Sequence, residues 1–220
     1  MLNTGEMLLS PSNKEEGASH TQGVAPMLFK EARNGFVGWE SHGSRIIKAS
    51  FKTKEEGITK NIIQCYAPTN DSNDDIKDQF YERLQSINEK CPTKDLTILM
   101  GDLNEVGIDN TGYEDIMGQH GLGERNKNGE RFANLCAFNE SVTGGTIFLH
   151  KHLHKATWIS PNHTTENQID HICINKKFRR TMEDVRTRRG ADIASDHYLV
   201  VANLKLKLKK NWTSGQTALP

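Results

Sequence analysis

Three short segments place acids, an amide and an imidazole beside apolar runs. Asp102 and Asn104 follow the run at 98–101, Asp170 stands inside the run at 168–174, and Asp196 and His197 precede the last run of the chain. Carboxylates and imidazoles can transfer protons, and carboxylates also bind divalent cations. Polar groups at strand ends in α/β folds are favoured positions for active sites, so these five residues are candidates for one.

Each segment also has an ordinary structural explanation. Asp102 and Asn104 after a strand are typical of a turn, and residues 195–197 could form another. Asp170 is unusual because Asp is depleted in strands and costly to bury unpaired, yet it could pair with a nearby lysine. Tyr66, in the segment CYAPT, is by default a core aromatic residue. Singly, these segments therefore leave the function open.

The elements that must position these residues follow from the apolar pattern. Short runs rich in β-branched residues predict strands at 24–29, 45–51, 58–66, 95–101, 146–148, 156–160, 168–174 and 197–209. Alternation in the last run predicts a face buried along its full length. A helix is predicted from 74 to 90 by apolar residues at helical spacing, namely Ile76, Phe80, Leu84 and Ile87. A second helix is expected around 128–136 with Asn128 as its N-cap, which makes the fold an α/β sandwich.

Composition excludes several classes of protein. The chain has 220 residues with formal net charge +0, but residues 1–140 hold 15 Lys/Arg against 22 Asp/Glu, and residues 141–220 hold 13 against 6. The C-terminal part could therefore face phosphate locally. We expect no membrane partner and no signal peptide, because no window approaches a membrane span and the N-terminus lacks a basic, apolar leader. Four cysteines without CxxC spacing indicate reduced thiols and a nuclear or cytoplasmic, not secreted, location.

Taken together, the segments stand in the order used by the endonuclease/exonuclease/phosphatase superfamily. They are NIIQCYAP at 61–68, GDLN at 101–104, ATWISP at 156–161, QIDHI at 168–172 and SDH at 195–197. Over residues 23–208 the chain resembles the endonuclease domain of RTE-type non-LTR retrotransposons and the craniofacial development protein 2-like genes derived from them. This resemblance implies a four-layer α/β sandwich of the DNase I-like type.

The resemblance also implies a role for each candidate residue in a metal-dependent phosphodiesterase that nicks DNA. Asp102 would align or deprotonate the attacking water, and Asn104 would hold that water. His197 would donate to a phosphate oxygen, oriented by Asp170, because a carboxylate favours the imidazolium form. Tyr66 would contact the phosphate. Such hydrolysis needs an activated water and relief of charge on the phosphoryl oxygens.

A divalent cation, Mg²⁺ or Mn²⁺, is implied as the cofactor. Asp196 would lie near the metal, and Trp158 would support the site or touch the nucleic acid. The family fold begins with a strand–helix–strand unit that ends in the principal metal-ligating Glu, and such a unit needs about 30 residues. Residues 1–22 are too few for it. The glutamates Glu6, Glu15, Glu16 and Glu40 do not match the family's metal-ligating Glu. We therefore expect an N-terminally truncated fold and an incomplete metal site.

The remaining expectations concern surfaces and domain limits. Four basic residues stand close together in the sequence and are candidate phosphate contacts. They are Lys176, Lys177, Arg179 and Arg180. His150, His152 and His154 could share a strand face and bind a transition metal, although a solvated basic loop is favoured. Residues 1–22 are predicted to be irregular or disordered, 23–209 to form the endonuclease/exonuclease/phosphatase-like domain, and 210–220 to be a linker or tail.

Three functions remain in competition. The first is a DNA-nicking endonuclease domain, truncated and weakly active or inactive, monomeric, and fused to a reverse transcriptase in the full element. The second is a catalytically dead remnant that binds nucleic acid or has no function. The third is a phosphatase of the same superfamily. The intact acids and imidazole favour the first, and the missing Glu favours the second.

Overall fold

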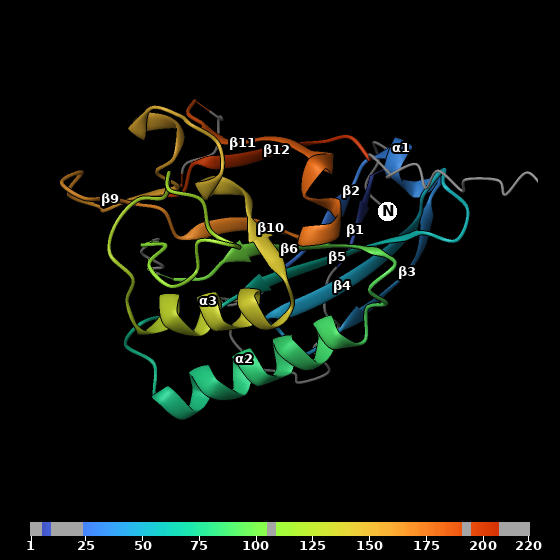
Figure 1. Ribbon diagram of the computed structural model, residues 1–220, viewed down its shortest axis with the longest axis horizontal. Helices are drawn as coiled ribbons and strands as arrows, with labels where there is room; N and C mark the ends of the chain where they lie inside the picture. The colour runs from blue at the N-terminus through green and yellow to red at the C-terminus, as the bar shows by residue number, and fades with distance from the viewer. Residues whose placement is uncertain (1–5, 10–23, 105–108, 191–194, 207–220) are drawn as a thin grey trace, which may run out of the picture.

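A computed structural model describes residues 6–9, 24–104, 109–190 and 195–206 (Figure 1). The α-helices are α1 (Lys30–Arg33), α2 (Asp74–Glu89) and α3 (Lys127–Phe138), and the 3₁₀ helices are η1 (Gly144–Thr146), η2 (His152–His154) and η3 (Lys176–Thr181). The strands are β1 (Met7–Leu8), β2 (Met27–Leu28), β3 (Phe36–Ser41), β4 (Ile46–Lys52), β5 (Thr59–Tyr66), β6 (Leu96–Asp102), β7 (Ser141–Thr143), β8 (Trp158–Ile159), β9 (Glu166–Asn167), β10 (Asp170–Asn175), β11 (Met182–Arg188) and β12 (Leu199–Leu204).

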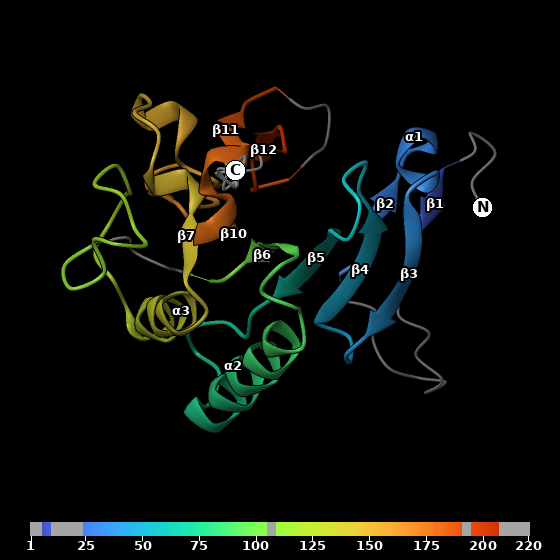
Figure 2. The same cartoon turned by 45° about the vertical axis from the view of Figure 1, so that its right-hand side comes forward.

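A six-stranded mixed sheet forms the centre of the fold. Its strand order is β3-β4-β5-β6-β10-β7. Only β5 and β6 pair in parallel, and α2 provides the crossover that a parallel pair requires. Figures 1 and 2 show α2 and α3 on one face of this sheet and the β11–β12 pair on the other. The predicted α/β sandwich is confirmed.

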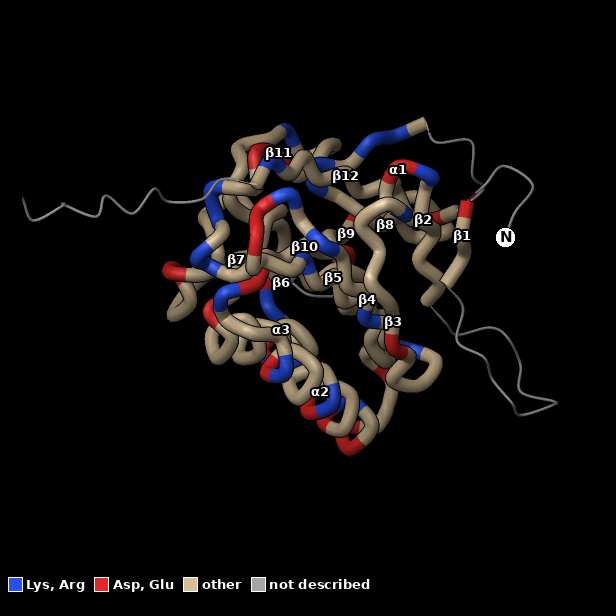
Figure 3. Tube along the Cα trace, turned by 90° about the vertical axis from the view of Figure 1, so that its right-hand side faces the viewer, with Lys and Arg blue, Asp and Glu red and all other residues tan. Residues whose placement is uncertain are grey.

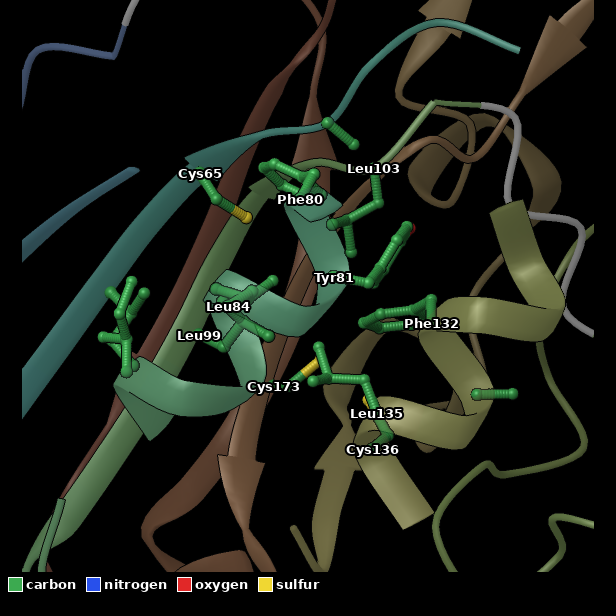
Figure 4. Packing of buried hydrophobic residues seen from close by; sticks show 14 of the residues in the cluster. Cys65, Phe80, Tyr81, Leu84, Leu99, Leu103, Phe132, Leu135, Cys136 and Cys173 are labelled. Carbon is green, nitrogen blue, oxygen red and sulfur yellow. The ribbon is translucent and has the colours of Figure 1, made fainter. Parts of the chain in front are cut away.

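The helices are held to the sheet by apolar side chains at helical spacing. In α2 these are Phe80, Tyr81, Leu84 and Ile87, and they pack on α3 and on the sheet around Phe132 and Cys173 (Figure 4). The expectation that Ile76 joins this face is wrong, because its side chain is 53% exposed. Lys77 is buried instead, and its Nζ donates to the carbonyl of Asn70 at 2.8 Å.

Two local predictions are wrong for identifiable reasons. Residues 146–148 do not form a strand, because the chain turns through η1 after the short strand β7. A Cβ on Gly144 would lie 2.5 Å from the sulfur of Met182, so the turn packs too closely for a side chain there. The N-cap of α3 is Asn126, whose side chain accepts the N–H of Gly129, whereas Asn128 is fully buried inside the helix.

The ends of the chain depart from expectation as well. Met7–Leu8 lies in the segment predicted to be irregular, yet it pairs with β2, while residues 10–23 and the predicted tail at 210–220 lie outside the described residues. Within the last predicted strand, 197–209, the described residues form β12, and residues 207–209 lie outside the described residues. The alternating side chains of β12 are half-buried, not buried, and Leu204 is exposed. Several strands were not predicted. They are β3, which forms an edge of the central sheet, β7, β11, and the two-residue strands β1 and β9.

Two expectations from composition can be compared with the described residues. All four cysteines are free and buried, as predicted for reduced thiols. No helix in this part of the chain has the length and apolar character needed to traverse a lipid bilayer.

Candidate active site

Two strands bring Asp102 and Asp170 together. Asp102 is the last residue of β6, and Asp170 is the first residue of β10. The two strands are antiparallel neighbours in a register that pairs Asp102 directly with Asp170. Opposite residues in such a pair have Cβ atoms about 4.5–5.5 Å apart. The buried remainder of both strands therefore fixes two carboxylates at one edge of the sheet.

The imidazole of His197 spans these two carboxylates. Its Nδ1 lies 3.0 Å from an oxygen of Asp170, and its Nε2 lies 4.0 Å from an oxygen of Asp102. The segment that carries it is held by an isolated β-bridge to Trp158 and by a bond from the His197 N–H to the Ser195 hydroxyl. Three predicted residues, distant in sequence, thus converge on one point.

Burial and charge perturb the acid–base properties of this group. Burial, together with the nearby charge of Asp170, raises the pKa of Asp102 to about 6. The hydrogen bond to Asp170 raises the pKa of His197 above its ordinary value, against the opposing effect of burial. A site with crowded carboxylates favours the arrival of positive charge, whether a proton or a metal ion.

The three side chains fit a divalent cation by their chemistry. One ligand atom each from Asp102, Asp170 and His197 lies within 4.8 Å of the others, and no other such group of three or more occurs among the described residues. The group contains no glutamate. Mg²⁺ binds through one or two carboxylates and keeps several waters, and carboxylates suit Mn²⁺ as well. Two carboxylates are therefore a sufficient, although sparse, set of oxygen ligands.

Asn104 acts on the site through a turn. Its backbone has a positive φ of 51°, which Asn tolerates better than most residues. The Asn104 N–H donates to Asp102 Oδ1 at 2.8 Å, and its side-chain amide donates to the Ala67 carbonyl at 2.6 Å. The turn that is typical of these residues is present, and it orients the Asp102 carboxylate.

Tyr66 stands beside Asp102, and an arginine that sequence inspection did not single out supports it. Tyr66 ends β5 and pairs in register with Asp102. The guanidinium of Arg45 lies 5.1 Å from the centre of the Tyr66 ring, and its Nη1 lies 3.3 Å from the carbonyls of Tyr66 and Ala67. The only sequence signal for this contact is the position of Arg45 immediately before the strand that pairs with β5.

Trp158 and Asp196 form a pair at the rim of the site. The indole Nε1 donates to Asp196 Oδ2 at 2.8 Å, and the Ile159 N–H donates to the Asp196 carbonyl at 2.9 Å. Asp196 is exposed and lies outside the three-residue group, but its charge helps to raise the pKa values of Asp102 and His197. Trp158 thus orients Asp196.

Two buried polar residues that were not predicted for the site hold its backbone. Thr157 is 1% exposed, and its hydroxyl oxygen accepts the N–H groups of Ile169 and Asp170 at 2.9 and 3.0 Å. The Asn128 amide donates to the carbonyls of Pro68 and Asn104 at 3.2 and 3.4 Å. Their signal in the sequence is weak, because threonine and asparagine are common and their partners are distant.

Comparison with known proteins agrees with this geometry. No family model matches the chain. Over 187 residues, or 85% of its length, it is 35% identical to craniofacial development protein 2 of Bos taurus and 34% identical to that of Tragulus javanicus. The chain spans about a third of the length of these relatives.

Solved structures decide the fold. The endonuclease domain of TRAS1, a telomere-specific non-LTR retrotransposon, superposes with a TM-score of 0.64 at 13% identity, over 92% of this chain and 81% of that chain. The chain therefore has the DNase I-like α/β fold of this endonuclease domain. An endonuclease/exonuclease/phosphatase family protein from Leptotrichia buccalis aligns with a TM-score of 0.50 at 16% identity, over 73% of this chain and 53% of its own. The resemblance expected from the sequence is confirmed.

The basic cluster of η3 is remote from the candidate active site. The cluster follows the carboxyl end of β10, whereas Asp170 opens that strand, and a strand of six residues spans about 17–20 Å. Lys176 lies 3.7 Å from Asp115, and Lys177 donates to the Lys94 carbonyl. Figure 3 shows Lys and Arg interspersed with Asp and Glu on the side that it views. Lys176, Lys177, Arg179 and Arg180 are therefore not brought together with the acids.

The histidines at 150–154 do not share a strand face. His152–His154 forms the 3₁₀ helix η2, so the alternative of a metal-binding strand is wrong. His150 Nε2 lies 2.7 Å from Asp184, and His152 Nδ1 lies 3.3 Å from Glu166. These histidines tie the loop before β8 to neighbouring strands.

Proposed function

We propose that this chain is a metal-dependent phosphodiesterase that nicks DNA, as the endonuclease domain of a non-LTR retrotransposon or of a gene derived from one. The observation that carries the proposal is the convergence of Asp102, Asp170 and His197 at one sheet edge. The likeness to the TRAS1 endonuclease domain supports the same reaction class, and the likeness to craniofacial development protein 2 supports a related ancestry.

Each residue would have a separate role that depends on its protonation state. A divalent cation held by Asp102 and Asp170 would supply positive charge for the phosphoryl oxygens and acidify a bound water. His197, whose pKa is raised by Asp170, would donate a hydrogen bond from Nε2 to a phosphate oxygen. Asp102 Oδ1 is held by the Asn104 N–H, which fixes the carboxylate that would align the attacking water.

The test is relaxation of supercoiled plasmid with and without Mg²⁺ or Mn²⁺. We expect weak, metal-dependent nicking that Asp102→Asn and His197→Ala each abolish. Matched controls are Asp115→Asn, at a 92% exposed carboxylate, and His120→Ala, at an imidazole outside the group; both should nick as the wild type does. Nicking that survives in both site variants would refute the proposal.

The second candidate, a catalytically dead remnant that binds nucleic acid, is favoured by one observation. The metal-binding group among the described residues has only two carboxylates. This candidate predicts DNA binding at low salt, no nicking at any metal concentration, and no effect of Asp102→Asn on DNA affinity. Plasmid relaxation and a binding titration on the same preparations separate the two candidates.

A further inference from the structure

A cavity opens near the end of the central sheet that carries Tyr66 and Asp102. It has a volume of about 160 Å³ and lies between the β3–β4 turn and α2. Its charged and titratable lining comes from His42, Arg45 and Arg83, while Pro68 and Phe80 contribute apolar walls. None of these residues belongs to the group formed by the two acids and His197.

Arg45 links this cavity to the candidate active site. Its guanidinium contacts the Tyr66 ring and the Ala67 carbonyl, and the Ala67 N–H donates to the Asp102 carbonyl. Arg45 directly precedes β4, and Asp102 ends β6, so two strand spacings separate them in the sheet. At about 4.8 Å per spacing, the backbone of Arg45 at the cavity wall lies roughly 10 Å from that of Asp102.

Arg83 reaches the turn because residue 43 is a glycine. Gly43 has φ +85°, and a Cβ placed on it would lie 3.2 Å from Nη1 of Arg83. The guanidinium therefore rests against bare backbone, where a side chain would crowd it. Arg83 makes no salt bridge with any carboxylate in the described ranges, so its charge is left for an external anion.

The other charges around the cavity do not cancel this positive character. Glu40 lies 3.3 Å from Lys48, which offsets its charge, and 3.4 Å from His42 Nε2. That nitrogen is buried and lies within ion-pair distance of Glu40, but it makes no hydrogen bond with the described residues. A buried polar atom without a partner is uncommon and is satisfied when a ligand or water accepts from it.

We propose that the cavity between the β3–β4 turn and α2 binds a backbone phosphate of the DNA strand, beside the phosphodiester that is cleaved. The proposal rests on the proposed function for the identity of the strand. A guanidinium matches a phosphate by its forked donors and permanent charge. A distance of roughly 10 Å corresponds to a phosphate within about three nucleotides of the cleaved bond.

The test measures binding without cleavage. A short fluorescein-labelled DNA duplex is titrated with protein in EDTA at several salt concentrations, and affinity is followed by fluorescence anisotropy. Arg83→Gln should reduce the slope of log K against log salt by about 0.9, the value for one lost phosphate contact. The matched control is Lys52→Gln, an exposed cation at the far end of β4, which should leave the slope unchanged.

Two further arms make the outcome decisive. Equal slopes for Arg83→Gln, Lys52→Gln and wild type would overturn the proposal. So would stabilisation of wild type, but not of Arg83→Gln, by inorganic phosphate with an unchanged DNA slope, because the cavity would then bind free phosphate. The titration is repeated in His197→Ala, which should not nick DNA. The salt slope then tests the phosphate contact alone, and a failure of the nicking activity can be told apart from a failure of this contact.

Discussion

Asp102 is held where its own charge is unfavourable. The carboxylate is buried and faces Asp170 across the strand pair, and both effects raise its pKa to about 6. The unfolded chain releases this proton near pH 4. Unfolding is therefore favoured as the pH rises from about 4 to about 6, and the destabilisation is complete above that range.

Neutralising this carboxylate should stabilise the protein. We expect Asp102→Asn to increase the free energy of unfolding at pH 7.5 by up to about 3 kcal/mol, since a shift of one pKa unit corresponds to about 1.4 kcal/mol. The gain should shrink as the pH falls towards 4, where the wild-type carboxyl is protonated in both states. Urea denaturation at several pH values measures this, with Asp115→Asn as the exposed control. An Asp102→Asn variant that is no more stable than wild type at pH 7.5 would contradict the raised pKa of Asp102.

The raised pKa of His197 should depend on Asp170. Replacing Asp170 with Asn removes the carboxylate that accepts from Nδ1, so the pKa of His197 should fall. Titration of the imidazole resonances by NMR in metal-free buffer measures the change directly. Glu166→Gln, beside His152, is the control and should leave the His197 resonance in place. An unchanged His197 pKa in Asp170→Asn would mean that the pair does not form in solution.

At the scale of single residues, the sequence predicted the chemical groups better than their supports. Asp102, Asp170 and His197 stand beside apolar runs, and the structure brings them together. Arg45 and Thr157 were not predicted for the site, because each acts on backbone 12 to 22 positions away. Contacts of this kind follow from strand pairing, which the pattern of apolar residues does not specify.

At the scale of elements, Gly101 allows β5 and β6 to carry Tyr66 and Asp102 side by side. A Cβ on Gly101 would lie 1.8 Å from the Cys65 carbonyl oxygen. Gly101→Ala should therefore lower the free energy of unfolding by about 3 kcal/mol or more, because the strands must separate. Gly38→Ala, on β3 with nothing within 4 Å of its Cβ, is the control and should change stability by about 0.5 kcal/mol or less. Urea denaturation decides; similar values for both variants would contradict the close packing.

We expect the Thr157 hydroxyl to stabilise the start of β10. Thr157→Val keeps the shape but removes the oxygen that accepts from Ile169 and Asp170. Leaving two buried N–H groups without a partner costs about 2–4 kcal/mol. Thr165→Val, at an exposed position of the following loop, provides the control. Thermal unfolding of both variants tests the difference, and equal melting temperatures would show that water replaces the hydroxyl.

Element prediction succeeded where packing and local pattern agree. The helix expected at 74–90 and the strands expected at 58–66 and 95–101 correspond closely to α2, β5 and β6. The edge strand β3 was not predicted, because Val37 and Trp39 are 57% and 38% exposed and Gly38 weakens the strand signal. The apparent strand at 146–148 failed because tertiary packing of Gly144 overrides its β-branched residues.

At the scale of the whole molecule, metal binding should appear as stability. An ion that binds only the folded state at 100 times its dissociation constant adds about 2.7 kcal/mol. Adding Mn²⁺ should therefore raise the melting temperature of wild type by several degrees. Asp102→Asn and Asp170→Asn should lose this response, and Asp115→Asn should keep it. Potassium chloride at matched ionic strength controls for screening, and an equal shift in every variant would argue against the site.

The basic cluster of η3 does not form a surface beside the acids of the candidate site. The cluster in η3 lies at the far end of β10, and Lys176 is already near Asp115. Arg45 beside Tyr66 and Arg189 over the Tyr198 ring lie nearer to the site and come from separate parts of the chain. A linear count of charge cannot locate a binding surface in a sheet whose strands alternate in direction.

Because Asp102 pairs with Asp170, metal binding reports whether β6 and β10 have the correct register. Sliding β10 past β6 by a single position would send one acid to the opposite side of the sheet. A misregistered chain could retain its helices and much of its compactness, yet it would offer the ion no paired acids. Manganese affinity would then distinguish a sheet in the correct strand register from one shifted by a residue, independently of any spectroscopic measure of secondary structure.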